Sequence, residues 1–104
     1  MKIKVYQINS KRDKKRIKFR GYDETVKAQD GLPLINRSIY DEVFSGEVEC
    51  KTLSDIYVLL NYGRCPAEYK GHSLSVSDII QTNGEFHFVD KVGFQKVEFT
   101  TLLD

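Results

Sequence analysis

The 104-residue chain has 40% hydrophobic and 30% charged residues, the balance of a globular domain, which excludes an intrinsically disordered chain. No apolar run in the sequence reaches the roughly 20 residues of a membrane span. We expect one domain over residues 1–104 with a single modest core. Because Met1–Val5 alternates apolar and charged residues, it predicts a strand and not a signal peptide, and hence a cytoplasmic protein.

The formal net charge of +1 conceals an uneven distribution of charge along the chain. Residues 1–20 hold nine Lys or Arg and one acid, Asp13, whereas residues 21–104 hold seven Lys or Arg and fourteen acids. A basic N-terminal segment therefore precedes an acidic remainder.

The first predicted strand spans Lys2–Ile8. Its alternation turns Ile3 and Val5 inward and three other side chains outward: Lys2, Lys4 and Tyr6. A charged connection over residues 11–16 leads to a second short strand, Ile17–Phe19. If these strands pair as a hairpin, their lysines and arginines gather on one face and at the loop.

Two helices and one further strand are predicted in the middle of the chain. A short helix over Glu24–Gln29 has Asp23 as its N-cap, and a strand over residues 39–49 has a turn or bulge at Gly46. The clearest helix begins at Thr52, where Asp55 completes a capping box. It continues to about residue 61 with an apolar stripe and ends where Asn61 or Gly63 can adopt a left-handed conformation; the stripe consists of Leu53, Ile56, Tyr57 and Leu60.

The segment Gly71–Ile80 alternates apolar residues with serines and predicts a half-buried strand. Asn83-Gly84 predicts the tip of a hairpin, with Glu85–Val89 as the returning strand and Phe94–Phe99 as a further one. The predicted fold class is therefore α+β: a mainly antiparallel sheet with one principal helix, about 52–61, packed on a face.

The chain resembles the YodL-like family, small domains found on conjugative and other mobile elements of Gram-positive bacteria. The resemblance runs nearly end to end, and its most specific part is the ten-residue motif Tyr69–Asp78. The other matching segments are Tyr6–Asn9, Arg12-Asp13 with Arg16, Ile39–Val48, Leu53–Tyr57, Val89-Asp90 and Gly93-Phe94.

The resemblance implies a function through the elements that carry the family. Such elements bring small accessory proteins that blunt restriction or CRISPR defences in a new host. It therefore implies an anti-defence protein, most simply an anti-CRISPR, that inhibits by binding the effector nuclease or its guide RNA. It implies no catalytic residue set and no cofactor.

The basic segment offers a contact surface for nucleic acid or a partner, formed by Lys11, Arg12, Lys14, Lys15, Arg16, Lys18 and Arg20. With Tyr6, Phe19 and Tyr22 nearby, it combines phosphate contacts with base stacking. The alternative is a solvated hairpin that keeps the protein soluble. A further hypothesis for the function is a nucleic-acid-binding regulator of the mobile element.

A second candidate surface is a flat, uncharged face of the predicted 71–80 strand, suited to docking a partner and made of Ser73, Ser75 and Ser77. The alternative is a polar face that only meets solvent. A row of acids that mimics phosphates is a further hypothesis, against acids spread over solvent faces: Asp41, Glu42, Glu47, Glu49 and Asp55.

His72 and His87 are the weak catalytic candidates, for RNA cleavage or, with an Asp, for holding a metal. No established catalytic motif accompanies them, and Gly71–Ser73 equally fits an ordered turn. Cys50 and Cys65 lack the paired neighbours of a zinc site, so we expect two reduced thiols. The preferred interpretation is a binding protein without catalysis, metal or cofactor.

Overall fold

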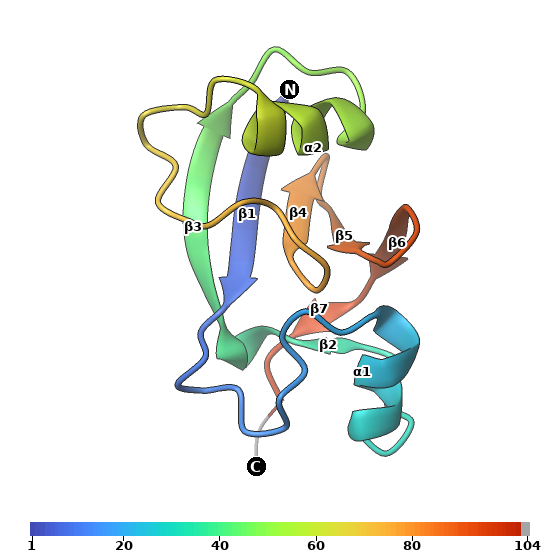
Figure 1. Cartoon of the computed structure of the whole chain (residues 1–104). Helices are drawn as coiled ribbons and strands as arrows, with labels where there is room; N and C mark the ends of the chain where they lie inside the picture. Colours follow the sequence, from blue (N-terminus) through green and yellow to red (C-terminus); the bar gives the residue numbers. More distant parts are fainter. Residues whose placement is uncertain (103–104) are drawn as a thin grey trace.

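The computed structural model describes residues 1–102 and has the predicted α+β class. A five-stranded antiparallel sheet has the strand order β3-β1-β4-β5-β6, and a short parallel pair is formed by β2 and β7 (Figure 1). In chain order the elements are β1 (Lys2–Ile8), α1 (Tyr22–Ala28), β2 (Ile35–Asn36), a 3-10 turn (Arg37–Ile39), β3 (Tyr40–Glu47), α2 (Leu53–Tyr62), β4 (Ile79–Thr82), β5 (Glu85–Val89), β6 (Phe94–Val97) and β7 (Phe99–Thr100).

Strand β1 is central because it pairs on both sides, with β3 and with β4. Its register with β3 shifts between Val5 and Tyr6, so that Val43 forms a bulge. The predicted turn or bulge at Gly46 is wrong, since β3 runs unbroken through it. Gly46 instead leaves room for an aromatic ring: a Cβ there would lie 2.9 Å from the ring of Phe44.

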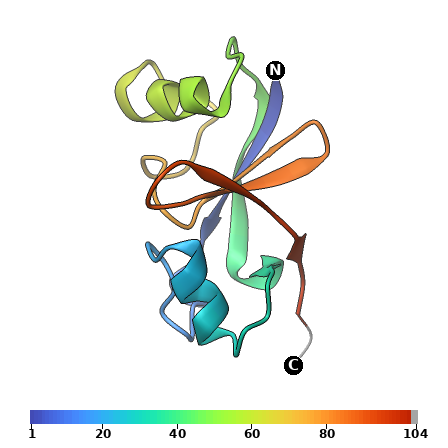
Figure 2. The same ribbon diagram turned by 90° about the vertical axis from the view of Figure 1, so that its right-hand side faces the viewer.

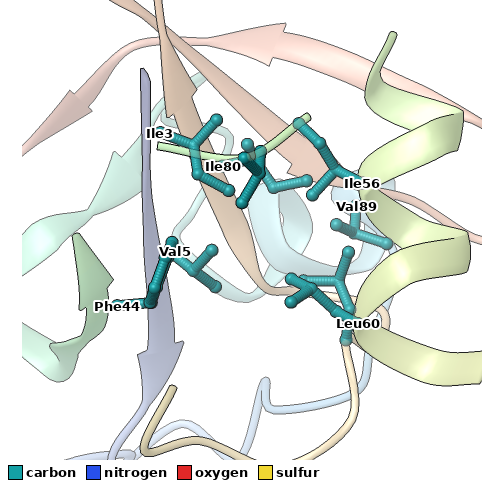
Figure 3. Packing of buried hydrophobic residues seen from close by; sticks show 9 residues of the cluster. Ile3, Val5, Phe44, Ile56, Leu60, Ile80 and Val89 are labelled. Atoms are coloured by element: carbon teal, nitrogen blue, oxygen red, sulfur yellow. The ribbon is translucent and has the colours of Figure 1, made fainter. Parts of the chain in front are cut away.

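One face of the sheet packs against α2, which confirms the predicted principal helix. Thr52 and Asp55 form the predicted capping box, with Asp55 N–H donating to Thr52 Oγ1 at 3.1 Å. The predicted left-handed end is wrong, because Gly63 has φ −96°. Figure 3 shows the helix side chains meeting the sheet; its labelled core residues are Ile3, Val5, Phe44, Ile56, Leu60, Ile80 and Val89.

A second core lies at the other end of the molecule, where β2, β7 and α1 gather (Figure 1). It corrects the expectation that Tyr6 faces outward, since Tyr6 is only 4% exposed. The ring of Phe99 on β7 lies 5.1 Å from the ring of Tyr6. Both faces of β1 are therefore covered, which alternation alone does not indicate.

The hairpin prediction is confirmed at Asn83-Gly84, which joins β4 to β5 with φ values of 53° and 75°. The final strand is shorter than expected. It ends at Val97, and Phe99 belongs to the second sheet.

Three local predictions are wrong. Ile17–Phe19 is not a strand and no N-terminal hairpin forms; residues 9–20 make a loop of turns. Helix α1 begins at Tyr22, so its N-cap is Gly21 and Asp23 lies in the first turn. Residues 71–78 also form a loop, with β4 starting only at Ile79.

Figure 2 shows α1 and α2 on the same side of the molecule, at opposite ends. Within residues 1–102, neither helix has the length and apolar character that crossing a bilayer requires.

Candidate binding site

The basic loop, residues 9–20, is an ordered structure although it contains no helix or strand. Its one acid is the organising residue: the Asp13 carboxylate accepts the N–H groups of Ile17 and Lys18, both at 3.0 Å. The Ile17 side chain is buried in the second core and anchors the loop. The loop therefore presents its cations from a fixed backbone.

Two of the loop's arginines are held by neighbours. Arg12 donates to the carbonyls of Ser38 and Tyr40 and pairs with Asp41 at 2.6 Å. The hydrogen bond from Arg12 to Asp41 is the main reason why the pKa of Asp41 lies below its usual value. Arg20 pairs with Glu24 at 3.3 Å. Both pairs are exposed and contribute little stability.

The remaining cations of the loop are more available. Lys18 Nζ donates to Ser10 Oγ at 3.3 Å. Four side chains are exposed and, within residues 1–102, have no ion-pair partner: Lys11, Lys14, Lys15 and Arg16. Lys11, Lys14 and Lys15 also line a pocket of about 440 Å³ between this loop and residues 36–39.

The motif loop, residues 69–78, folds around the side chain of Gln7 on β1. Gln7 is 3% exposed, and its Nε2 donates to the carbonyl of His72 and to Asp78 Oδ2, each at 2.9 Å. Its Oε1 accepts the His72 N–H at 3.0 Å. Asn61 at the end of α2 fixes the next turn, because its amide bonds both the N–H and the carbonyl of Leu74.

Asp78 closes the motif loop from the inside. It is 1% exposed, and its Oδ2 accepts from Gln7 Nε2 and from the Ser75 N–H at 2.8 Å. Its Oδ1 is buried without a hydrogen-bond partner among residues 1–102. Burial raises the pKa of Asp78 to about 7. Burial likewise raises the pKa of Tyr40, whose hydroxyl donates to the Ser77 carbonyl at 2.6 Å.

The two loops meet at one point. The Phe19 N–H donates to Ser77 Oγ at 2.9 Å, and the His72 ring approaches the Phe19 ring at 5.7 Å, edge to face. Lys18 Nζ lies 5.2 Å from the centre of the same ring. The motif loop and the basic loop therefore form one surface, with Phe19 and His72 exposed on it.

The predicted flat face made of Ser73, Ser75 and Ser77 does not form. Ser73 is exposed and Ser75 half-buried, but Ser77 is 1% exposed and points to the backbone of Phe19. Without a strand here, the three hydroxyls do not share a face. Of the acids proposed as a phosphate-like row, two pair with cations of the basic segment, Asp41 with Arg12 and Glu42 with Lys4.

The two histidines occupy different places. His72 contacts Gln7, Ser73 and Phe19, whereas His87 on β5 pairs with Ile80 and Lys96 in the sheet and lies 4.0 Å from Glu85. Within residues 1–102, no hydrogen bond or ring contact links the two histidines. In the same range no three His, Cys, Asp or Glu side chains are grouped to hold a metal ion.

Both cysteines are free thiols, Cys50 half-buried and Cys65 exposed. Burial raises the pKa of Cys50, so its thiol is a poor nucleophile.

Two residues that organise the site, Gln7 and Asn61, are not among the predicted site residues. Gln7 does carry a signal in the sequence, because it continues the inward-facing positions of Ile3 and Val5 as a polar residue. A polar side chain in a buried strand position must find partners, and here these come from the motif loop. Asn61 gives no comparable signal.

The fold and the site define a small α+β domain that presents an ordered cationic surface beside a polar, buried support. The chain belongs to the YodL-like domain family, which it matches over residues 2–99. No curated protein and no solved structure matches the chain.

Proposed function

We propose that the chain is a non-enzymatic anti-defence protein of a mobile element, an anti-CRISPR that acts in the cytoplasm. It binds a host ribonucleoprotein nuclease through the basic loop, at the guide RNA. The observation that carries the proposal is the set of four exposed cations without ion-pair partners among residues 1–102: Lys11, Lys14, Lys15 and Arg16.

The electrostatics favour phosphates as the ligand of this surface. Lysines and arginines that neutralise phosphates release counterions, so affinity rises steeply as salt falls. The loop has no helix that would enter the groove of a duplex, which favours RNA in a ribonucleoprotein over double-stranded DNA. An RNA-cleaving enzyme is disfavoured because His72 and His87 make no contact with each other.

The test is inhibition of target cleavage by a CRISPR nuclease of a Gram-positive host, with increasing amounts of the protein. Inhibition should saturate near one inhibitor per nuclease and leave the guide RNA intact. Neutralising the four cations, with Lys to Gln and Arg to Gln, should weaken inhibition by at least about tenfold. The control removes the same charge elsewhere, at Lys2, Lys27, Lys51 and Arg64, and should inhibit normally.

Three results would contradict the proposal. Inhibition at far below one protein per nuclease, with cut RNA, would indicate an enzyme. Equal loss in the control variant would show that net charge alone matters. Binding only to DNA of the mobile element, without any host component, would indicate a regulator.

A further inference from the structure

Phe19 is exposed in an unusual setting. It is 56% exposed although it is a large apolar side chain, and it lies at the junction of the basic loop and the motif loop. Lys18 Nζ is 5.2 Å from its centre, and the edge of His72 approaches at 5.7 Å. The ring is therefore an apolar surface surrounded by cationic and polar groups.

The backbone under the ring is held in a costly conformation. Phe19 has φ +70°, a region that L residues with bulky side chains rarely adopt. Ser77, which accepts the Phe19 N–H, has φ +83°. Strained residues at two contacting positions persist only where the surroundings impose them, and such strain concentrates at functional sites. Core packing does not explain it, because Phe19 is more than half exposed and belongs to neither core.

We propose that Phe19 is a stacking anchor for an unpaired base of single-stranded RNA, whose phosphates lie along Lys14, Lys15 and Arg16. Every base has a flat face that stacks on an aromatic ring, so this contact is tolerant of sequence. A base inside a duplex has both faces covered and cannot stack this way. More than half of Phe19 is exposed, although the His72 ring and Lys18 Nζ contact its ring.

This inference rests on the proposed function and deepens it by naming the ligand as unpaired RNA. Two surfaces that the sequence offered for stacking are removed by the structure, since Tyr6 is buried and Tyr22 packs against Phe88 at 5.8 Å. Phe19 remains as the aromatic side chain exposed on the basic loop. The motif loop then positions Phe19 at two points: Ser77 accepts its N–H, and His72 contacts its ring.

The experiment measures binding of the full chain to a fluorescently labelled, unstructured RNA of about 12 nucleotides, by anisotropy from about 50 to about 300 mM NaCl. F19A should bind about tenfold more weakly with an unchanged salt dependence, because stacking does not release counterions. K14Q/K15Q should lower the slope of log affinity against log salt by about 1.4, at about 0.7 for each phosphate of a single strand that is no longer neutralised.

Three further variants separate stacking from folding. F19G removes the ring and also relieves the positive φ, so it should unfold at the same or a higher temperature than the wild type while binding as weakly as F19A. Y62A removes another exposed aromatic ring, 80% exposed at the end of α2, and should leave affinity unchanged. F19W should bind at least as well as the wild type.

Several results would overturn the inference. These are full affinity in F19A, a loss of salt slope in F19A equal to that of K14Q/K15Q, or equal affinity for the same RNA as a duplex. If the wild type binds no RNA while F19A still loses nuclease inhibition, Phe19 contacts protein; the RNA assignment and the guide-RNA contact then both fail, while inhibition of the nuclease by binding survives. If RNA binding depends on Phe19 but no nuclease is inhibited, the proposed function fails and the inference stands.

Discussion

Replacing Asp78 by asparagine should stabilise the protein at neutral and alkaline pH but not in acid. The Asp78 carboxyl is 1% exposed and its pKa is raised from 3.8 to about 7, mainly because burial disfavours the charged form. Between these values the folded state binds a proton that the unfolded state has released. The contribution of Asp78 to stability is therefore complete below about pH 4 and is lost as the pH rises through about 7.

The size of the effect follows from the same pKa values. Each pH unit of difference corresponds to about 1.4 kcal/mol, so a change from 3.8 to about 7 amounts to about 4 kcal/mol. The asparagine side chain of D78N has nearly the shape of the protonated acid. Its oxygen can accept from Gln7 and Ser75 as Oδ2 does, and its NH₂ would occupy the position of Oδ1, which is buried without a partner among residues 1–102.

The assay is urea unfolding of wild type and D78N, followed by circular dichroism, at intervals from about pH 4.5 to about pH 8.5. The difference between the two proteins cancels the titration of groups that behave alike in both. We expect D78N to gain on the wild type progressively, by about 3 kcal/mol between the two ends of this pH range, since part of the full effect is already present at about pH 4.5. If the two curves of unfolding free energy against pH are parallel, or if the wild type gains stability relative to D78N as the pH rises, burial does not govern the pKa of Asp78 and the reasoning is refuted.

Two further predictions test the supports of the site. G71A should lower the unfolding free energy by about 2–4 kcal/mol, because a Cβ there would overlap the Gln7 amide and lie 2.9 Å from Val43 Cγ2. Urea unfolding checks it, and an unchanged midpoint would mean that Gln7 can move without loss. T52A should cost about 1 kcal/mol because the capping box is removed, and it should leave RNA affinity unchanged because α2 lies away from the basic loop. Weaker RNA binding at constant stability in T52A would contradict this separation.

The sequence predicts the elements that neighbouring residues decide. The capping box needs only Thr52 and Asp55, three positions apart, and the hairpin needs only Asn83-Gly84 between two alternating strands. The central strand Lys2–Ile8 is equally clear from its own period. The YodL-like resemblance, carried by short local motifs, is confirmed over residues 2–99.

The motif loop differs from the predicted strand because its hydrogen-bond partners lie far away in the sequence. The alternation of serines with Leu74 and Val76 imitates a strand, but Leu74 bonds Asn61 and the His72 backbone bonds Gln7, 65 residues distant. A backbone that finds such partners does not need a neighbouring strand. The packing of Phe99 against Tyr6 depends equally on a distant contact, since it requires β7 to cover the sheet.

Ser77 accepts the Phe19 N–H although its own backbone is strained. At φ +83° a glycine would be less strained, but a glycine has no hydroxyl to accept the Phe19 N–H. The same residue accepts from Tyr40 at its carbonyl and donates its N–H to Val89, so it is tied to β3 and β5 as well. A strained serine therefore joins the sheet to the basic loop. The two strained residues, Phe19 and Ser77, therefore lie at the two ends of one hydrogen bond, which fixes the backbone beneath the exposed ring.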